Sequence, residues 1–165
     1  MRLLLLPFLI IPFFAPCQCP TKAIDGEDVF KKISSMDSCF FTTAYSCYAK
    51  KNRHMFTADL EFYHDVTGVT HSADEFMAII NNNFCETNRK IGLKRKVKEG
   101  SVQVFPLYNN GVLYGAVQYG EHYFFEVNTN PEKRVGLAKF THVWIIENGF
   151  WKMSRILSYD HKPAN

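Results

Sequence analysis

Apolar positions follow a helical spacing in the first half of the chain and a strand-like alternation in the second. Apolar residues recur every three or four positions over residues 29–47, which predicts an amphipathic helix of about six turns. Asp25 is its expected N-cap. Asp37 is expected at the solvent edge of the apolar face, although a carboxylate pointing into a pocket is the alternative. A Ser-x-x-Glu capping box at Ser72 opens a second predicted helix, which reaches residue 84.

From residue 93 onward the pattern is that of strands separated by turns. After a first strand at residues 60–65, the expected strands cover residues 93–98, 102–107, 113–125, 138–147 and 150–160. Helices followed by consecutive antiparallel strands predict an α+β fold in one domain, residues 18–165. Aromatic residues on both faces of the long strands suggest a sheet that is covered on both sides, with a second subunit as one cover.

The last two predicted strands flank Asn148-Gly149, a pair suited to a two-residue type I′ turn. Counting outward from that turn places Trp144 opposite Met153, and His142 opposite Arg155. One face then carries Phe140, His142, Trp144, Met153, Arg155, Leu157 and Tyr159. A buried imidazole beside a guanidinium needs polar partners. For Arg155 these are a ligand or a structural carboxylate, with Glu61, Asp37 and Asp160 as the candidates.

Composition and charge leave the picture of a globular domain unchanged. The chain is 47% hydrophobic and 21% charged, with a net charge of +3. Lys94, Lys96 and Lys98 would share one exposed strand face, and no aromatic stacking motif accompanies them. We therefore expect no nucleic-acid partner.

The N-terminal residues have the layout of a signal peptide, which we assign to residues 1–17. Arg2 precedes an apolar stretch, and a small-residue cleavage box follows it. That stretch is shorter than the roughly 20 residues that span a bilayer, so no membrane span is expected. A buried N-terminal helix is the second interpretation, which the two prolines of the stretch disfavour. The sequence predicts an exported protein, periplasmic or secreted. A lipid-anchored N-terminus is a third interpretation, which the residues before the cysteines fit poorly.

Export makes disulfide bonds possible. Cys39 and Cys47 are eight positions apart in one predicted helix, a separation of about 12 Å, and a disulfide needs Cα atoms within about 7 Å. We therefore expect Cys85 to pair with one of them and favour Cys47–Cys85, with free buried thiols as the alternative. The body of the chain has no Cys-x-x-Cys motif, so no cysteine zinc site or redox site is predicted.

Three phrases carry a family resemblance: EFYHD at residues 61–65 followed by VTG, GEHYF at 120–124, and KFTHVWIIENGFWKMSRILSYDH at 139–161. Together they resemble the SnoaL-like branch of the nuclear-transport-factor-2-like superfamily, in particular its exported bacterial members of unknown function. The resemblance covers residues 26–161. It implies a cone-shaped, cystatin-like fold in which a bent antiparallel sheet wraps around N-terminal helices. It also implies a pocket at the open end and a homodimer formed through the sheet.

Polar and aromatic residues on the predicted strands are the candidate ligand-binding residues: His64, His122, His142, Trp144, Arg155 and Tyr159. The expected pocket is lined by Phe40, Tyr45, Trp144 and Met153, with Arg155 at its floor. Three histidines on separate strands could bind zinc, but no His-x-His or His-carboxylate spacing supports this, so we expect neither a metal nor a cofactor.

Superfamily resemblance does not select a function, because its members include isomerases, cyclases, dehydratases and non-catalytic binding or assembly domains. We favour binding of a small, mostly apolar ligand that carries a carboxylate or carbonyl group. The first alternative is an isomerase-, cyclase- or dehydratase-type enzyme with His142 or His64 as proton carrier. The second is a dimerisation module. Ser154, Ser158 and Cys39 lack a recognisable His-acid pattern, so nucleophilic catalysis is not predicted, and no catalytic residue is assigned.

Overall fold

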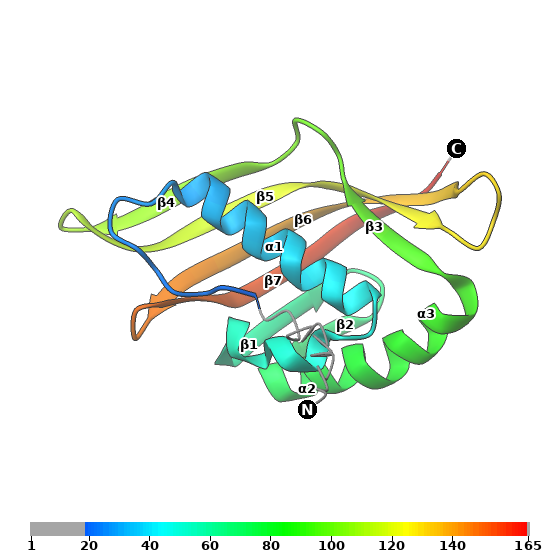
Figure 1. Ribbon diagram of the computed structural model, residues 1–165, viewed down its shortest axis with the longest axis horizontal. Coiled ribbons are helices and arrows are strands. Elements are labelled where there is room, and N and C mark those ends of the chain that lie inside the picture. Colours follow the sequence, from blue (N-terminus) through cyan, green and yellow to red (C-terminus); the bar gives the residue numbers. More distant parts are fainter. Residues whose placement is uncertain (1–18, 165) are drawn as a thin grey trace, which may run out of the picture.

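The described helices all lie before residue 92 and the chain from Leu93 onward forms strands, as the hydrophobic pattern predicts, with two further strands between the helices (Figure 1). The computed structural model describes residues 19–164. The predicted signal peptide, residues 1–17, lies outside the described residues. None of the helices between Cys19 and Ala164 has the length and apolarity that crossing a bilayer requires.

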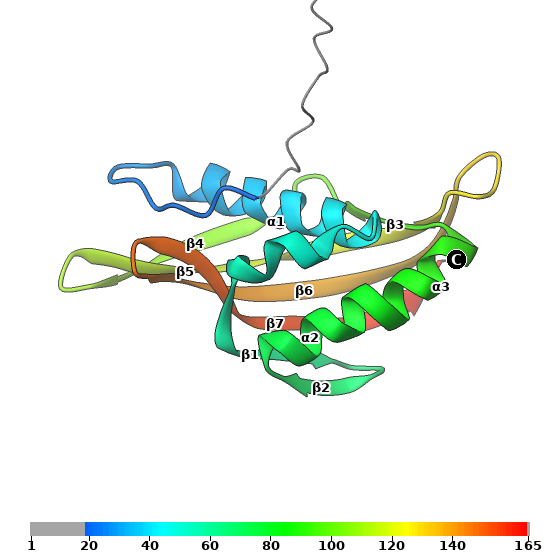
Figure 2. The same ribbon diagram turned by 60° about the horizontal axis from the view of Figure 1, so that its bottom comes forward.

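Helix α1 (Val29–Tyr45) is the central helix of the fold. Asp28, and not the predicted Asp25, caps it, and its side chain accepts a hydrogen bond of 3.1 Å from the backbone N–H of Lys31. The helix also ends before the predicted residue 47, because Cys47 has a left-handed φ of 63°. Figure 2 shows α1 stacked over the long strands of the sheet.

A second helical run closes one side of the fold. A 3₁₀ segment, η1 (Ala49–Met55), leads into strands β1 (Phe56–His64) and β2 (Gly68–His71). Ser72 then caps α2 (Ala73–Ile79) as predicted, and its hydroxyl accepts the N–H of Glu75. The π-helical turn η2 (Ile80–Phe84) and helix α3 (Cys85–Ile91) continue from it.

Seven strands form one bent sheet in the order β2-β1-β7-β6-β5-β3, with β4 also paired to β5. The later strands are β3 (Leu93–Val97), β4 (Gln103–Asn109), β5 (Val112–Glu126), β6 (Lys133–Glu147) and β7 (Phe150–Pro163). The predicted α+β, cystatin-like architecture is confirmed. The sheet is mixed and not wholly antiparallel, because β1 pairs in parallel with β7.

The β6–β7 hairpin departs from the predicted register at two bulges. Trp144 pairs with Met153 as expected, but the register then shifts, and Val143 pairs with Arg155. Arg155 therefore lies on the outer face of the sheet, and its predicted position beside His142 is wrong. A second shift near Asp160, whose φ is 58°, separates the Lys139–Tyr159 and Leu137–Lys162 pairs.

Two disulfide bonds tie the helices to the rest of the fold. The expected Cys47–Cys85 bond joins the residue after α1 to the start of α3, with Cα atoms 5.4 Å apart. Cys19–Cys39, which we did not predict, fixes the segment before α1 to the middle of that helix. The core between helices and sheet centres on fully buried aromatic and sulfur-containing side chains, which include Phe40, Phe56, Trp144, Trp151 and Met153.

Candidate functional site

A cavity of about 660 Å³ lies between α1, the α2–η2 run and the inner face of the sheet. Its walls are mostly apolar, with Phe41 and Tyr45 from α1 and Phe76 and Ile80 from the second helical run. The polar side chains that line it are His64, Thr67, Arg95, His122, His142, Ser158, His161 and Lys162. A largely apolar cavity of this size with a few converging polar groups is typical of a small-molecule site.

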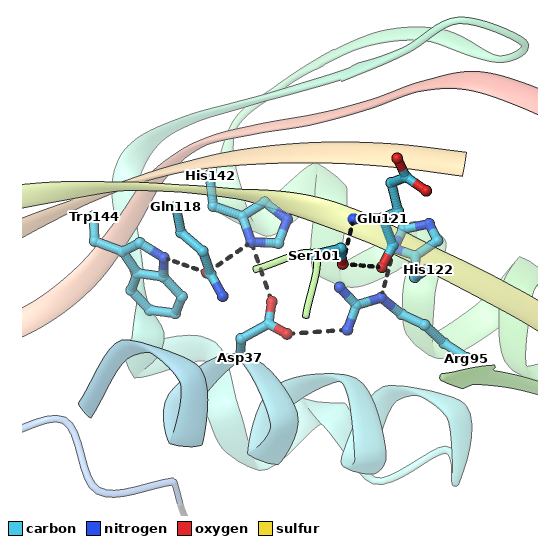
Figure 3. A network of polar contacts seen from close by, with 8 residues as sticks. All are labelled: Asp37, Arg95, Ser101, Gln118, Glu121, His122, His142 and Trp144. Carbon is cyan, nitrogen blue, oxygen red and sulfur yellow. Dashed lines mark hydrogen bonds and ion pairs between the residues drawn. The ribbon is translucent and has the colours of Figure 1, made fainter. Parts of the chain in front are cut away.

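Arg95 and Asp37 form a buried ion pair at the inner end of this cavity (Figure 3). Arg95 Nη1 lies 3.0 Å from Asp37 Oδ2, and each side chain is 3% exposed. The guanidinium also lies over the ring of Phe41, 3.9 Å from its centroid. Since the pair is removed from water, each charge depends on the other. We call Asp37, Arg95, Gln118, His122 and His142 the inner cluster.

His122 is a neutral imidazole in the inner cluster. Arg95 Nε donates to His122 Nδ1 at 2.9 Å, so the ring hydrogen of His122 belongs on Nε2. Burial, reinforced by the positive charge of Arg95, lowers the pKa of His122 to about 2. At neutral pH this side chain therefore offers the cavity an N–H donor and no charge.

His142 is held by hydrogen-bond acceptors on two elements. Its Nδ1 lies 3.2 Å from Asp37 Oδ1 and 3.4 Å from Gln118 Oε1, and that amide oxygen also accepts the indole N–H of Trp144 at 3.0 Å. We assign the Nδ1 hydrogen to the nearer and more strongly accepting carboxylate. Burial lowers the pKa of His142 more than Asp37 raises it, so the ring is neutral.

Asp37 remains ionised in spite of its position. Burial raises the pKa of its carboxyl group, but the charge of Arg95 and the contact with His142 outweigh that effect and hold the pKa at about 2. The cluster thus contains one anion, one cation and two neutral imidazoles, with no net charge.

Two donors of the inner cluster lack a partner. Among residues 19–164, no group accepts a hydrogen bond from Arg95 Nη2 or from His122 Nε2, although both atoms are buried. Both side chains line the cavity. Buried polar groups in native proteins are nearly always paired, so donors left over beside a cavity indicate where an acceptor atom of a ligand could bind.

The structure divides the predicted ligand-binding residues into three groups. His64, His122 and His142 line the cavity, while Trp144 is buried behind Gln118 and does not line it. Arg155 and Tyr159 lie on the outer face, away from the cavity, because the register shifts between the Trp144–Met153 and Val143–Arg155 pairs. There Arg155 Nε pairs with Glu61 Oε2 at 2.8 Å, one of the structural partners we considered. Whether the histidines bind a ligand stays a prediction.

The predicted pocket lining also needs correction. Of its five residues only Tyr45 lines the cavity; Phe40 and Met153 belong to the core. The bend of the sheet moves the cavity toward the far ends of the long strands, which a residue count along one hairpin cannot show.

Sequence reasoning missed Arg95 and His161 as cavity residues, and it favoured the solvent edge of α1 for Asp37, which is buried. Asp37 is four positions from both Ile33 and Phe41, a spacing that places it on the buried face of α1. Arg95 stands between two exposed lysines of β3, and strand alternation turns it inward. Both signals were present in the sequence. Alternation from Met153 would also give His161 the inner face, because the two register shifts cancel there, but the predicted strand ended at residue 160.

The sequence matches no protein-family model and no curated protein. Solved structures are similar in fold, at low sequence identity. A nuclear-transport-factor-2-like protein with a cystatin-like fold from Novosphingobium aromaticivorans superposes with a TM-score of 0.65 and 12% identity, over 78% of this chain and 79% of that one. A nuclear-transport-factor-2-like protein of unknown function from Shewanella oneidensis gives 0.59 and 14%, over 79% and 98%.

A third similar structure, from Xanthomonas campestris, is described as a calcium/calmodulin-dependent protein kinase II association domain. It superposes with a TM-score of 0.59 and 16% identity, over 84% of this chain and 92% of that one. At such identities the comparison concerns the fold alone. The resemblance to the SnoaL-like branch stays a prediction from sequence, whereas the three-dimensional comparison establishes that this chain has the nuclear-transport-factor-2-like, cystatin-like fold.

Proposed function

We propose that the protein binds a small, mostly apolar carbonyl compound in the cavity, with the carbonyl oxygen at the inner cluster. The observation that carries this proposal is the pair of unpartnered buried donors, Arg95 Nη2 and His122 Nε2, beside an apolar cavity. An acceptor oxygen placed there would satisfy groups whose burial is otherwise unfavourable.

Charge favours a neutral carbonyl over a carboxylate. Asp37 already neutralises Arg95, so a carboxylate would bring an unbalanced negative charge into an apolar cavity. A ketone, aldehyde, amide or ester oxygen accepts the same hydrogen bonds without that penalty. The sequence led us to expect a ligand with a carboxylate or a carbonyl group, and the charge balance of the inner cluster narrows this expectation to a carbonyl group.

Thermal-shift measurements with 2-undecanone and undecanoic acid test the proposal. Ligand binding to the folded state raises its stability, by about 2.7 kcal/mol at a hundred times the dissociation constant. We expect the ketone to raise the melting temperature more than the acid. An Ile80→Trp variant, which fills the cavity, should lose the shift. Ile91→Trp, at an exposed position of the neighbouring helix, should keep it.

His122→Phe tests the donor itself, because phenylalanine keeps a ring of similar shape without the Nε2 hydrogen. We expect its affinity for the ketone to fall about tenfold, the effect of one lost hydrogen bond. No shift with any apolar carbonyl compound, or an equal shift in Ile80→Trp, would refute the proposal.

His142 supports an acid-base enzyme as the second candidate function. Its Nδ1 lies against two acceptors, Asp37 Oδ1 and Gln118 Oε1, so the ring hydrogen belongs on Nδ1 and the lone pair on Nε2 remains available as a base in the cavity. A base near donors that polarise a carbonyl could remove a proton from the adjacent carbon. Exchange of that proton for deuterium, followed by NMR, would support this candidate if His142→Gln abolished the exchange while binding was retained.

The outer face of the sheet supports a homodimer as the assembly candidate. Phe105 and Tyr119 are stacked there with ring centroids 5.9 Å apart and are 49% and 38% exposed. A second copy of the chain is the partner that we propose for this face, and the mass in solution of wild type and Tyr119→Lys tests it. We also propose export, supported by the two disulfide bonds; N-terminal sequencing of the secreted protein would test it.

A further inference from the structure

We propose that Ser158, His161 and Asp65 form a nucleophile–base–acid triad at the outer end of the cavity, which transfers the acyl group of an apolar ester to water. Together with His64 we call these residues the rim cluster. Ser158, His161 and His64 line the cavity, and Asp65 lies directly behind His161. This inference rests on the proposed function in one respect: the same cavity must admit apolar carbonyl compounds.

Strand pairing brings together the two segments of the rim cluster, although Asp65 and His161 are 96 residues apart in the sequence. β1 and β7 are parallel, His64 is the register partner of Ser158, and the N–H of Asp65 donates to the Ser158 carbonyl at 3.2 Å. The bulge at Asp160, with its left-handed φ of 58°, then turns His161 into the cavity. Bulges that redirect a side chain in this way are common next to active sites.

Distances within the cluster follow the order of a catalytic triad. His161 Nδ1 lies 2.5 Å from Asp65 Oδ1, and Asp65 Oδ2 accepts the backbone N–H of His161 at 3.1 Å. The other ring nitrogen, Nε2, lies 3.4 Å from Ser158 Oγ. A nucleophile–base contact is often this loose before substrate binds. Asp65 thus fixes the tautomer that leaves Nε2 free to accept the serine proton.

Asp65 is an anion at neutral pH. Burial raises the pKa of its carboxyl group, but the hydrogen bonds from the backbone and ring of His161 outweigh that effect and lower the pKa below its usual range. A carboxylate in this position can stabilise the imidazolium that forms when His161 takes the serine proton. Asp65 is therefore a positioning residue in this proposal.

His64 supplies a donor for the developing oxyanion. Its Nδ1 accepts the backbone N–H groups of Val66 and Thr67 at 3.2 and 3.3 Å, so its hydrogen belongs on Nε2. Burial, with the nearby His161, lowers the pKa of His64 and favours this neutral form. The two imidazole rings stack with centroids 4.4 Å apart, and His64 is the register partner of Ser158 on the neighbouring strand.

The same contacts argue against a metal ion held by this cluster. His64, Asp65 and His161 each place a ligand atom within 4.8 Å of the others. However, the Nδ1 atoms of both histidines are already used, one by backbone donors and the other by Asp65. A metal bound through the Nε2 atoms would need His64 to lose the hydrogen that its Nδ1 contacts place on Nε2, whereas a serine nucleophile uses the ring hydrogens as they stand.

The proposed reaction is ester hydrolysis in two steps. Ser158 Oγ attacks the carbonyl carbon while His161 Nε2 takes its proton, and the tetrahedral intermediate then loses the alcohol, which receives that proton. Water attacks the acyl-serine, gives a proton to His161, and the bond to Ser158 Oγ breaks as that oxygen regains the proton. The sum is ester plus water giving acid plus alcohol.

Labelling with an alkyl fluorophosphonate and hydrolysis of p-nitrophenyl butyrate test the triad in the full chain. We expect one covalent adduct, located at Ser158 by peptide mass spectrometry, and ester hydrolysis above the buffer rate. Ser158→Ala should lose both. Ser154→Ala removes a hydroxyl from the same strand outside the cavity lining and should keep both. His161→Gln should slow hydrolysis by at least about 100-fold.

Asp65→Asn provides a readout that a purely structural role would not change. Without the carboxylate, the ring hydrogen of His161 is no longer fixed on Nδ1, so kcat for p-nitrophenyl butyrate should fall by about 10⁴-fold with KM unchanged. An unchanged kcat, or a rise in KM alone, would contradict the role of Asp65. Hydrolysis that survives in Ser158→Ala, or that a chelator removes and zinc restores, would overturn the triad.

Binding measurements separate this inference from the proposed function. Ser158→Ala should still show the thermal shift with 2-undecanone. If wild type shows that shift but forms no adduct and hydrolyses no ester, the triad is refuted and the binding function stands. If wild type shows neither shift nor reaction, both proposals fail.

Discussion

The inner cluster and the rim cluster use the same residue types in one cavity, yet their surroundings differ. Inside, Asp37, Arg95 and His142 are 1–3% exposed, whereas Asp65 and His161 at the rim are 35% and 21% exposed. Only the inner cluster contains an arginine, and it donates to one histidine while pairing with the carboxylate. Depth of burial therefore separates the two aspartate–histidine contacts, because the inner charges are removed from water and depend on one another, whereas the rim groups remain partly solvated.

Among the variants that test this comparison, Arg95→Met should have the largest effect on stability. It leaves the Asp37 carboxylate buried without its cation, so we expect a loss of about 3–5 kcal/mol in the free energy of unfolding. Urea denaturation measures the loss. The double variant Arg95→Met/Asp37→Leu should be more stable than Arg95→Met alone, because no uncompensated charge remains. A single-variant loss below about 1 kcal/mol would mean that water reaches the pair.

The inner histidines should make the fold sensitive to acid. Unfolded His122 binds a proton below about pH 6.5, whereas folded His122 remains neutral down to about pH 2. Above pH 6.5 the protonation of His122 therefore costs no stability. Below pH 6.5 the free energy of unfolding falls by up to about 1.4 kcal/mol per pH unit, because only the unfolded state takes up the proton. Asp37 adds a further loss as the pH falls from about 4 toward 2, because its folded-state pKa is lowered.

Urea denaturation between pH 7.5 and 4.5 measures this slope. His122→Gln should flatten it, whereas His71→Gln, at an exposed position, should leave it unchanged. Equal slopes in wild type and His122→Gln would show that His122 does not carry the acid sensitivity.

Substitution of the two aspartates compares the clusters directly. Asp37→Asn should lower the melting temperature strongly, since it leaves Arg95 as an uncompensated buried cation. Asp65→Asn should leave the melting temperature close to that of wild type, because its carboxylate is partly solvated. Differential scanning calorimetry on both variants tests this, and a larger shift for Asp65→Asn would reverse the assignment of roles.

Arg155→Met should have the smallest effect. Its pair with Glu61 lies on the outer face, where about one third of each side chain is exposed, so we expect a change of about 0–1 kcal/mol. Binding of 2-undecanone should be unchanged, because Arg155 does not line the cavity. If a folded Arg155→Met variant lost binding, that result would instead support the contact between Arg155 and the ligand that we expected from the sequence.

Local patterns predicted the elements well, because each depends on few neighbours. The capping box at Ser72, the Asn148-Gly149 turn and the Trp144–Met153 pair all appear in the structure. Helix geometry excluded a Cys39–Cys47 bond and left Cys85 to pair with either cysteine, and the pairing that we favoured, Cys47–Cys85, is the one present. The cystatin-like fold followed from the element order together with the family resemblance.

The candidate site was predicted less well, because one bulge reverses every later side chain in a strand count. The shift after Met153 moved Arg155 out of the cavity, and the shift at Asp160 brought His161 into it. Residue spacing within α1 and within β3 could have predicted that Asp37 and Arg95 point inward. It could not have predicted that they pair, because 58 residues separate them in the sequence.

The sequence by itself determined the helices, the strands and the final turn, because spacing and turn chemistry act over a few residues. Only the tertiary structure decided which polar side chains meet, since that depends on bulges, on sheet curvature and on the parallel pairing of β1 with β7. His64 and Asp65 reach Ser158 and His161 through that pairing alone. Burial also makes the surroundings of the ionisable groups differ between the two clusters, because the inner side chains are removed from water and the rim side chains are partly exposed.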